Sequence, residues 1–331
     1  MINKTRKMRN LIRYTILLLA IHTYGQELNV PAWTQYLADN NFALSPTYAG
    51  IGDDVKVRAN GLTQWVGIKN APDNQALYAD VRIFDRSGVG LSLYNDKNGN
   101  TLQKGFKLSF SHHLVLNQPT RQYLSFGISY NQNAFRIDID NFNPTFDTPI
   151  IDPAITDDRS ITNHNFDIGA LYRYRGFYLS FNASNILTKK IDDFTGIEPS
   201  QLLNYQVFSG LIIKPARNKK VQLEPSLYVQ LFNSDGRSST DINFKYRKFN
   251  RDGDYYWIGG SYRFLNDQFG KPLNIGPMAG IRKSKFYFAY SYQITTNDLT
   301  SFNSGTHSVT IGIDFLQGIS NCPCTKSHVD D

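Results

Sequence analysis

The chain has 331 residues, of which 20 are Tyr and 22 are Phe, with 35 Lys and Arg against 28 Asp and Glu. Five of the basic residues and no acid lie in the first 25 residues, so the remainder carries 35 − 5 − 28 = +2. This near-neutral balance, with no basic run interleaved with aromatics, argues against a nucleic-acid partner.

The first 25 residues have the layout of a secretory signal peptide. A basic start is followed by an apolar run at 14–21 and then by the small residues Thr23 and Gly25, after which we expect cleavage. The alternative is a short membrane anchor, but the run is shorter than the roughly 20 residues that a spanning helix needs. Residues 26–54 show no alternation, and we expect an N-terminal periplasmic arm or a partial plug of a barrel mouth.

Beyond residue 54, apolar and polar residues alternate along most of the chain, which is typical of strands whose side chains point to opposite faces. The last segment is the clearest, because Val309, Ile311 and Ile313 share one parity and Thr310 and Asp314 the other. We predict fourteen strands, at 55–65, 75–84, 88–94, 106–116, 124–132, 166–174, 177–184, 206–214, 221–232, 240–246, 255–264, 273–282, 285–292 and 308–315. Pro225 and Pro277 count mildly against this scheme, because each removes a ladder donor.

The predicted connections alternate in length. Short turns at 85–87, 117–123, 175–176, 215–220 and 283–284 alternate with mostly longer loops at 95–105, 134–165, 185–205, 233–239 and 293–307, and only 247–254 is long for its side. Outer-membrane barrels have short periplasmic turns and longer external loops, whereas a soluble sandwich has no reason to sort its loops. We therefore predict an all-β fold, a single transmembrane β-barrel of about 14 antiparallel strands over 55–315, of outer-membrane type, with a C-terminal tail at 316–331 and both termini periplasmic.

Residues able to carry chemistry form no recognisable site. His112 and His113 are adjacent and would point to opposite faces of a strand, so they cannot share a metal. His164 and His307 are single histidines beside loops. Five aspartates near the longest loop match no calcium-binding spacing, and we expect a solvated acidic loop: Asp138, Asp140, Asp152, Asp157 and Asp158. No nucleophile or phosphate-binding motif is present, so we predict no enzyme, no catalytic residue, no metal and no cofactor.

The two cysteines, Cys322 and Cys324, flank Pro323 beyond the last predicted strand. A disulfide across one residue would be strained, and two thiols alone make a poor zinc site. A framework role is therefore not predicted, which leaves a redox or intermolecular role as the alternative.

Several short motifs resemble the PorP/SprF family of outer-membrane proteins associated with the type IX secretion system. The most specific block comprises Thr34-Gln35-Tyr36, Asn41, Ser45-Pro46-Thr47-Tyr48-Ala49-Gly50, Leu62-Thr63-Gln64-Trp65-Val66-Gly67 and Ala71-Pro72. Later pieces are Gly88-Val89-Gly90, Asn95-Asp96-Lys97-Asn98-Gly99, Leu124-Ser125-Phe126-Gly127 and Gly305-Thr306-His307-Ser308. One departure is Ser45-Pro46-Thr47, where the family usually has Asn-Pro-Ala. The motif positions, with structural or partner-contact roles, are Gln35, Tyr36, Asn41, Pro46, Gly50, Gln64, Trp65, Gly67 and Pro72.

The resemblance implies a non-enzymatic outer-membrane component of type IX protein secretion, which aids surface delivery of adhesins in gliding relatives. Its partners would be outer-membrane lipid and either the secretion machinery or exported substrate proteins. A barrel of this size is too narrow to pass a folded protein, so we expect a docking site rather than a conduit. The alternatives are a porin for small solutes, with Glu224 as one of few lumen charges, and a secreted soluble β-sandwich adhesin.

Overall fold

The computed structural model describes residues 34–137, 159–187, 203–216, 220–233, 236–250, 253–268, 270–296, 298–317 and 322–327. The predicted signal peptide and the five loop aspartates lie outside these ranges. Among the described residues, no helix is long and apolar enough to cross a membrane.

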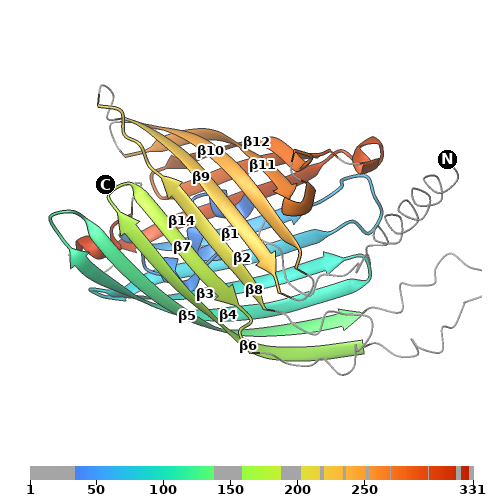
Figure 1. Ribbon diagram of the computed structural model, residues 1–331, viewed down its shortest axis with the longest axis horizontal. Coiled ribbons are helices and arrows are strands. Elements are labelled where there is room, and N and C mark those ends of the chain that lie inside the picture. Colours follow the sequence, from blue (N-terminus) through green and yellow to red (C-terminus); the bar gives the residue numbers. More distant parts are fainter. Residues whose placement is uncertain are drawn as a thin grey trace, which may run out of the picture.

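Fourteen strands of the described chain form one closed antiparallel barrel, in which each strand pairs with its neighbours in sequence and β1 pairs with β14 (Figure 1). The strands are β1 (Asp54–Thr63), β2 (Asp73–Phe84), β3 (Ser87–Asn98), β4 (Thr101–Asn117), β5 (Gln122–Ile137), β6 (Arg159–Tyr174), β7 (Phe177–Ser184), β8 (Asn204–Leu211), β9 (Val221–Phe232), β10 (Ser238–Phe249), β11 (Tyr255–Leu265), β12 (Pro272–Lys283), β13 (Phe286–Thr295) and β14 (Thr306–Gln317). The predicted fold and all fourteen predicted strands are confirmed.

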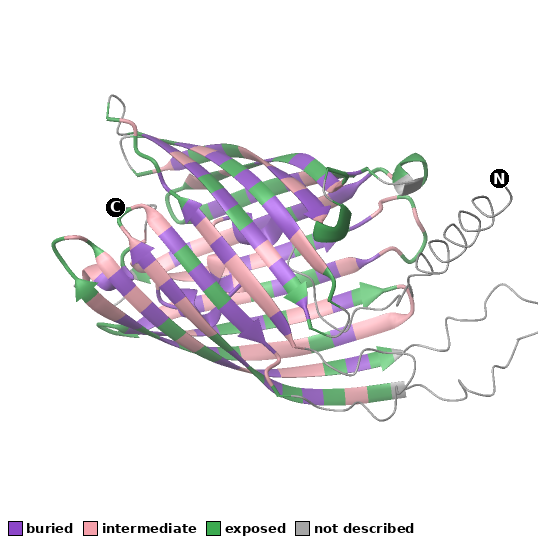
Figure 2. Cartoon of the chain, viewed as in Figure 1, coloured by how far each residue is buried: buried purple, intermediate pink, exposed green. Residues whose placement is uncertain are grey.

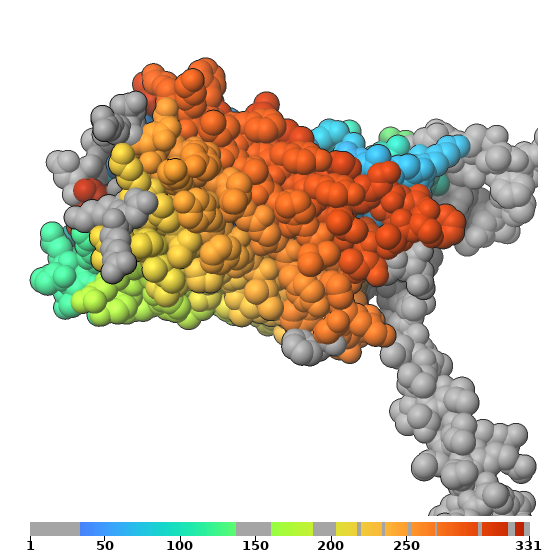
Figure 3. Space-filling model, turned by 90° about the horizontal axis from the view of Figure 1, so that it is seen from above, coloured from blue at the N-terminus to red at the C-terminus, as the bar shows by residue number. Residues whose placement is uncertain are grey.

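The barrel is apolar outside and polar inside, as a membrane barrel must be. Figure 2 shows buried and more exposed residues alternating along the strands. Ile311 is 56% exposed and Val309 39% exposed, whereas Thr310 between them is buried. A β-sandwich would bury the apolar row between two sheets, so that alternative is wrong. Figure 3 shows the outer wall from β9 to β14, coloured yellow to red, as a continuous surface of consecutive strands.

Two details of the strand scheme need correction or explanation. The predicted loop at 95–105 is a tight turn, because β3 and β4 continue to the pair Asn98–Thr101 and Gly99 turns the chain with φ +61°. Each of the two prolines is paired with one neighbouring strand, and the ladder with the other neighbour is interrupted beside it. The β12–β13 pairing skips from Ile275 to Met278, and Pro225 lies beyond the last β8–β9 pair of the main ladder, at Ser226.

The two ends of the barrel differ. One end, called the short-turn end, carries the short connections 85–86, 118–121, 175–176, 250–254 and 284–285 and the longer connection 212–220. The opposite end, called the long-loop end, carries 64–72 and the two longest connections, 138–158 and 185–203. This difference allows each feature of the lumen to be assigned to one end.

Candidate functional site in the barrel lumen

Residues 34–50, called the inner segment, lie inside the barrel (Figure 1, blue). The segment folds as three short 3-10 turns, η1 (Thr34–Leu37), η2 (Asn41–Ala43) and η3 (Pro46–Tyr48). Its apolar side chains form the core of the molecule together with inward-facing residues of the wall. The Tyr36 ring lies 5.3 Å from Phe208 and 5.1 Å from Tyr228, within the range of favourable aromatic contacts. The middle of the lumen is therefore filled by the chain itself.

The inner segment rests on a row of glycines on the inner wall, formed by Gly88, Gly90, Gly127 and Gly169 of β3, β5 and β6. A Cβ on Gly127 would lie 2.6 Å from Thr47 N, and one on Gly90 would lie 2.2 Å from the Phe42 ring. Real Cβ atoms essentially never come this close, so a side chain at either position would force its neighbour to move, and at Gly127 that neighbour is backbone. We call this row the glycine seat.

The local structure of η3 explains why Ser45-Pro46-Thr47 can replace the usual Asn-Pro-Ala. Ser45 caps the turn, since its Oγ accepts a hydrogen bond from Thr47 N at 3.3 Å, and Pro46 follows at the first position. Asn and Ser are about equally good caps, and proline is favoured just after them. The departure therefore preserves the geometry that seats this turn on the barrel wall.

Charged groups at the short-turn end hold the inner segment by its Asp39. The Asp39 carboxylate accepts hydrogen bonds from Lys245 Nζ at 2.9 Å, from Arg247 Nη2 at 2.6 Å and from the Tyr255 hydroxyl at 2.9 Å. Burial alone would raise the pKa of Asp39, but the two cations outweigh it and hold that pKa well below its usual range. Glu224, which the alternation placed in the lumen, is beside the same cluster, 3.4 Å from Arg247.

A second set of contacts ties the two ends of the inner segment to the wall. The Tyr36 hydroxyl donates to Asp241 at 3.0 Å, and Arg263 grips the same carboxylate with two bonds of 2.6 Å. At the other end of the segment, Gly50 N donates to Asp80 at 2.9 Å. Asp80 belongs to β2, whereas Asp241 and Arg263 belong to β10 and β11, several strands away around the barrel. The inner segment therefore connects distant parts of the wall.

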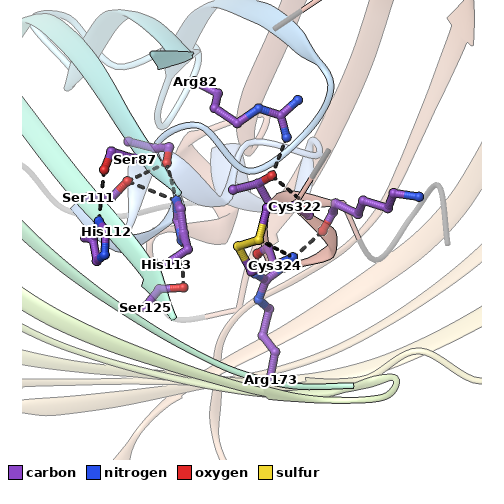
Figure 4. Close-up of a disulfide and its surroundings, with 12 residues drawn as sticks. Arg82, Ser87, Ser111, His112, His113, Ser125, Arg173, Cys322 and Cys324 are labelled. Atoms are coloured by element: carbon purple, nitrogen blue, oxygen red, sulfur yellow. Dashed lines mark hydrogen bonds between the residues drawn. A yellow bond between two sulfur atoms is a disulfide. The ribbon is translucent and has the colours of Figure 1, made fainter. Parts of the chain in front are cut away.

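The C-terminal tail, residues 322–327, returns to the short-turn end and covers the inner segment (Figure 4). Gly52 N donates to Thr325 O at 2.8 Å. Arg82 donates to the Thr325 hydroxyl, and Arg173 donates to the carbonyls of Cys324 and Lys326. Cys324 and Thr325 are fully buried by these contacts.

The two cysteines form a disulfide, so the expectation that none would be made across one residue is wrong. The cause is the turn η7 (Pro323–Thr325), which brings the two Cα atoms to 5.2 Å, within the usual range for a disulfide.

His112 and His113 lie on opposite faces of β4, as predicted, whereas His164 and His307, expected beside loops, lie within β6 and β14. His112 is exposed on the outer face beside Ser87, with 2.9 Å between Ser87 Oγ and Nδ1, whereas His113 is buried inside. His113 contacts Ser125 Oγ at 2.8 Å and Ala49 O at 3.1 Å, and therefore holds the end of the inner segment (Figure 4). His164 and His307 each contact a tyrosine hydroxyl of a neighbouring strand on the exposed side. Among the described residues, no group of three or more potential ligands could hold a metal ion.

The motif positions lie in two places. Gln35, Tyr36, Asn41, Pro46 and Gly50 belong to the inner segment. The others belong to the β1–β2 connection at the long-loop end: Gln64, Trp65, Gly67 and Pro72. There the chain pairs with the segment before β14, through bonds of 3.0 Å from Val66 N to Gly305 O and 2.7 Å from Ser304 N to Val66 O.

Sequence reasoning missed the residues of the lumen that hold the inner segment, above all Asp39, Asp241 and Arg247. The one available signal was the polar parity of β10, which places Asp241, Lys245 and Arg247 on the same inward face. Their partners lie some 200 positions earlier in the chain and are identified only by the fold.

Two cavities flank the inner segment, each of about 100 Å³. The first, at the short-turn end, has charged walls that include Asp39, Arg58, Arg247 and Asp314. The second, at the long-loop end, has amide and hydroxyl walls that include Ser129, Asn131, Asn133, Asn204 and Gln206. The second is called the long-loop cavity.

The sequence profile described as type IX secretion system membrane protein PorP/SprF matches residues 25–313. The chain belongs to the PorP/SprF family. The matched range spans the inner segment and nearly all of the barrel, so the PorP/SprF assignment confirms the resemblance seen in the motifs and places the protein in the outer membrane. No match was found among curated proteins.

Several solved structures align with this PorP/SprF protein at low similarity. The CymD monoaromatic hydrocarbon channel is 8% identical with a TM-score of 0.48, over 90% of this chain and 95% of that one. The beta domain of the Bordetella autotransporter BrkA is 12% identical with a TM-score of 0.39, over 80% and 99%. Outer membrane phospholipase A from Escherichia coli is 9% identical with a TM-score of 0.37, over 80% and 90%.

Proposed function

We propose that this PorP/SprF protein is a closed, non-enzymatic docking barrel of the type IX secretion system, which binds an exported protein or a component of the machinery. The observation that carries the proposal is the filled lumen. The inner segment and the C-terminal tail are held by buried ion pairs and hydrogen bonds to many strands, so a translocating chain would have to displace both. Binding at the ends of the barrel needs no such displacement.

The proposal includes a sidedness. The short-turn end, where both the inner segment and the tail are anchored, would face the periplasm, because short turns lie on that side in outer-membrane barrels. The long-loop end would then face the exterior and offer its connections to an exported protein. Both termini would be periplasmic, and the tail at the short-turn end supports this arrangement.

Deletion of the gene followed by proteomics of the medium and the cell surface tests the export role. We expect specific exported proteins to be lost from the surface while other outer-membrane proteins stay at their normal levels. A matched strain that carries the complete chain with the Gly61→Ala substitution, at a lipid-facing site with open space around it, should secrete normally. Unchanged secretion in the deletion strain would refute the role.

Conductance in planar bilayers separates this role from that of a solute porin. A lumen filled by the inner segment predicts no steady open channel for the complete protein. Steady conductance with solute-dependent flux would instead favour the porin alternative.

A further inference from the structure

The long-loop cavity is a chamber whose floor is the inner segment, including Phe42 and Pro46, and whose walls come from β2 to β9. Its polar side chains are almost all amides and hydroxyls. Of the described residues that line it, only Lys107 and Asp167 are charged, and they neutralise each other at 2.7 Å. A molecule that fits these walls should therefore carry no net charge, since a buried ion would lack a counter-charge.

The hydrogen bonds in the wall show which polar atoms around the long-loop cavity already have partners and which do not. Asn131 Nδ2 donates to Asp167 Oδ1 at 2.8 Å, Gln206 Nε2 donates to Asn204 Oδ1 at 2.8 Å, and Asn133 Nδ2 donates to Gln103 Oε1 at 3.1 Å. The opposite atoms, Asn131 Oδ1, Asn133 Oδ1 and Gln206 Oε1, are buried and accept no hydrogen bond from the described residues. Asn131 is only 2% exposed.

Buried acceptors without donors are costly, and a water, an ion or a ligand can supply the missing donor. The amide orientation of Asn131 is fixed, because its Nδ2 already donates to a carboxylate. The wall therefore contains three carbonyl oxygens, on β5 and β8, that accept no hydrogen bond from the described residues, beside serine hydroxyls such as Ser129 that can donate or accept.

We propose that the long-loop cavity binds a neutral, polyhydroxylated ligand, that is, a saccharide unit. Sugar hydroxyls donate to the Asn131, Asn133 and Gln206 oxygens and accept from the neighbouring hydroxyls. A peptide fits less well, because peptide strands are usually bound by pairing with an exposed sheet edge, and a closed barrel has none. The proposal is independent of the export role.

Isothermal titration of the full chain, purified in a detergent without a sugar headgroup, tests the proposal. The probes are four neutral disaccharides, namely maltose, cellobiose, lactose and N,N′-diacetylchitobiose. We expect at least one to bind with a Kd of about 1 mM or tighter. Asn131→Leu and, on a different strand, Gln206→Leu should each weaken it by about tenfold, because each removes a buried acceptor.

Asn274→Leu is the matched control, since Asn274 is a buried amide of the inner face that does not line the cavity, and its Kd should stay within about twofold. Heat-dependent mobility on gels shows whether each variant is a folded barrel. A glycopeptide bearing the same sugar shows whether the cavity accepts a glycan attached to a protein or only a free sugar. Binding of either supports the proposal. Failure of all four sugars, equal effects of N131L and N274L, or binding of a neutral peptide without sugar overturns it.

Discussion

The two halves of the lumen, on either side of the inner segment, are built from different chemistry. The short-turn half holds ion pairs with almost no exposure, such as Arg58–Asp314 at 2.6 Å and Arg247–Asp39 at 2.6 Å, and is covered by the tail. The long-loop half also contains the ion pairs Arg263–Asp241 and Lys107–Asp167, but its cavity is lined mainly by amides and hydroxyls, with acceptors left over. Removal of one partner of a buried ion pair strongly destabilises the fold, because the other charge stays buried without a partner. An unpaired amide oxygen, by contrast, can accept a hydrogen bond from a ligand. The first half is suited to holding a segment in place and the second to receiving a ligand.

Substitution of Asp39 by alanine should have the largest effect on the short-turn half. It leaves Lys245 and Arg247 buried without their main carboxylate, which destabilises the seated segment by ~3–5 kcal/mol. Hydrogen exchange of residues 34–50, followed by mass spectrometry, should accelerate by about a hundredfold or more. Asp53→Ala is the control, because Asp53 is 45% exposed in its pair with Arg82 and should matter by less than ~1 kcal/mol. Equal exchange in both variants would mean that charge does not anchor the segment.

Substitution of Gly127 by leucine tests the glycine seat by steric means. The new side chain would collide with Thr47 and Pro46, and overpacking of this kind costs about 1–3 kcal/mol. We expect the inner segment to leave its seat and the barrel to show ion conductance in planar bilayers. The matched variant is Gly61→Leu, at a lipid-facing position with no atom within 4 Å of its Cβ, which should stay closed. A closed G127L barrel would show that the wall, not the segment, closes the lumen.

The strands could be predicted from sequence because alternation is a local signal, and each strand such as β14 shows it within its own residues. Contacts inside the lumen could not be predicted in this way. Tyr36 and Asp241 are separated by 205 positions, and nothing local marks Gly127 as the floor under Thr47. The motif resemblance did select Tyr36, Pro46 and Gly50, which lie in the inner segment and contact the wall.

Two other differences follow from short-range geometry. The polar residues Asn95 to Lys97 predict a loop, yet they continue β3 beyond the apolar band of the barrel, and the chain turns tightly at Gly99. A spacing of one residue argues against a disulfide, but the turn η7, which begins at Pro323, brings the two cysteines together.

Removal of the C-terminal tail, residues 322–331, should have a smaller effect than the first two changes. Gly52 N loses its acceptor Thr325 O, and a single hydrogen bond contributes about 1 kcal/mol. Exchange of the Gly52 amide should therefore accelerate by roughly fivefold, while residues 34–40 change little. Cys322→Ser with Cys324→Ser, which keeps the tail but removes the disulfide, separates the backbone contacts from the covalent bond. Unchanged exchange at Gly52 after truncation would mean that the tail contacts this part of the chain without stabilising it.

Acidification should have the smallest effect, and the direction of the change in stability follows from the pKa of Asp39. The pKa of this carboxyl is lowered in the folded protein, so its stabilising contribution is complete above the ordinary aspartate pKa of about 3.9 and is lost only as the pH falls towards the lowered value. Between pH 8 and pH 5, protection factors of residues 37–41, next to Asp39, corrected for intrinsic exchange, should stay constant. A loss of their protection with a midpoint near pH 5 would show that the pKa of Asp39 is raised. The two cations would then not hold it as their distances imply.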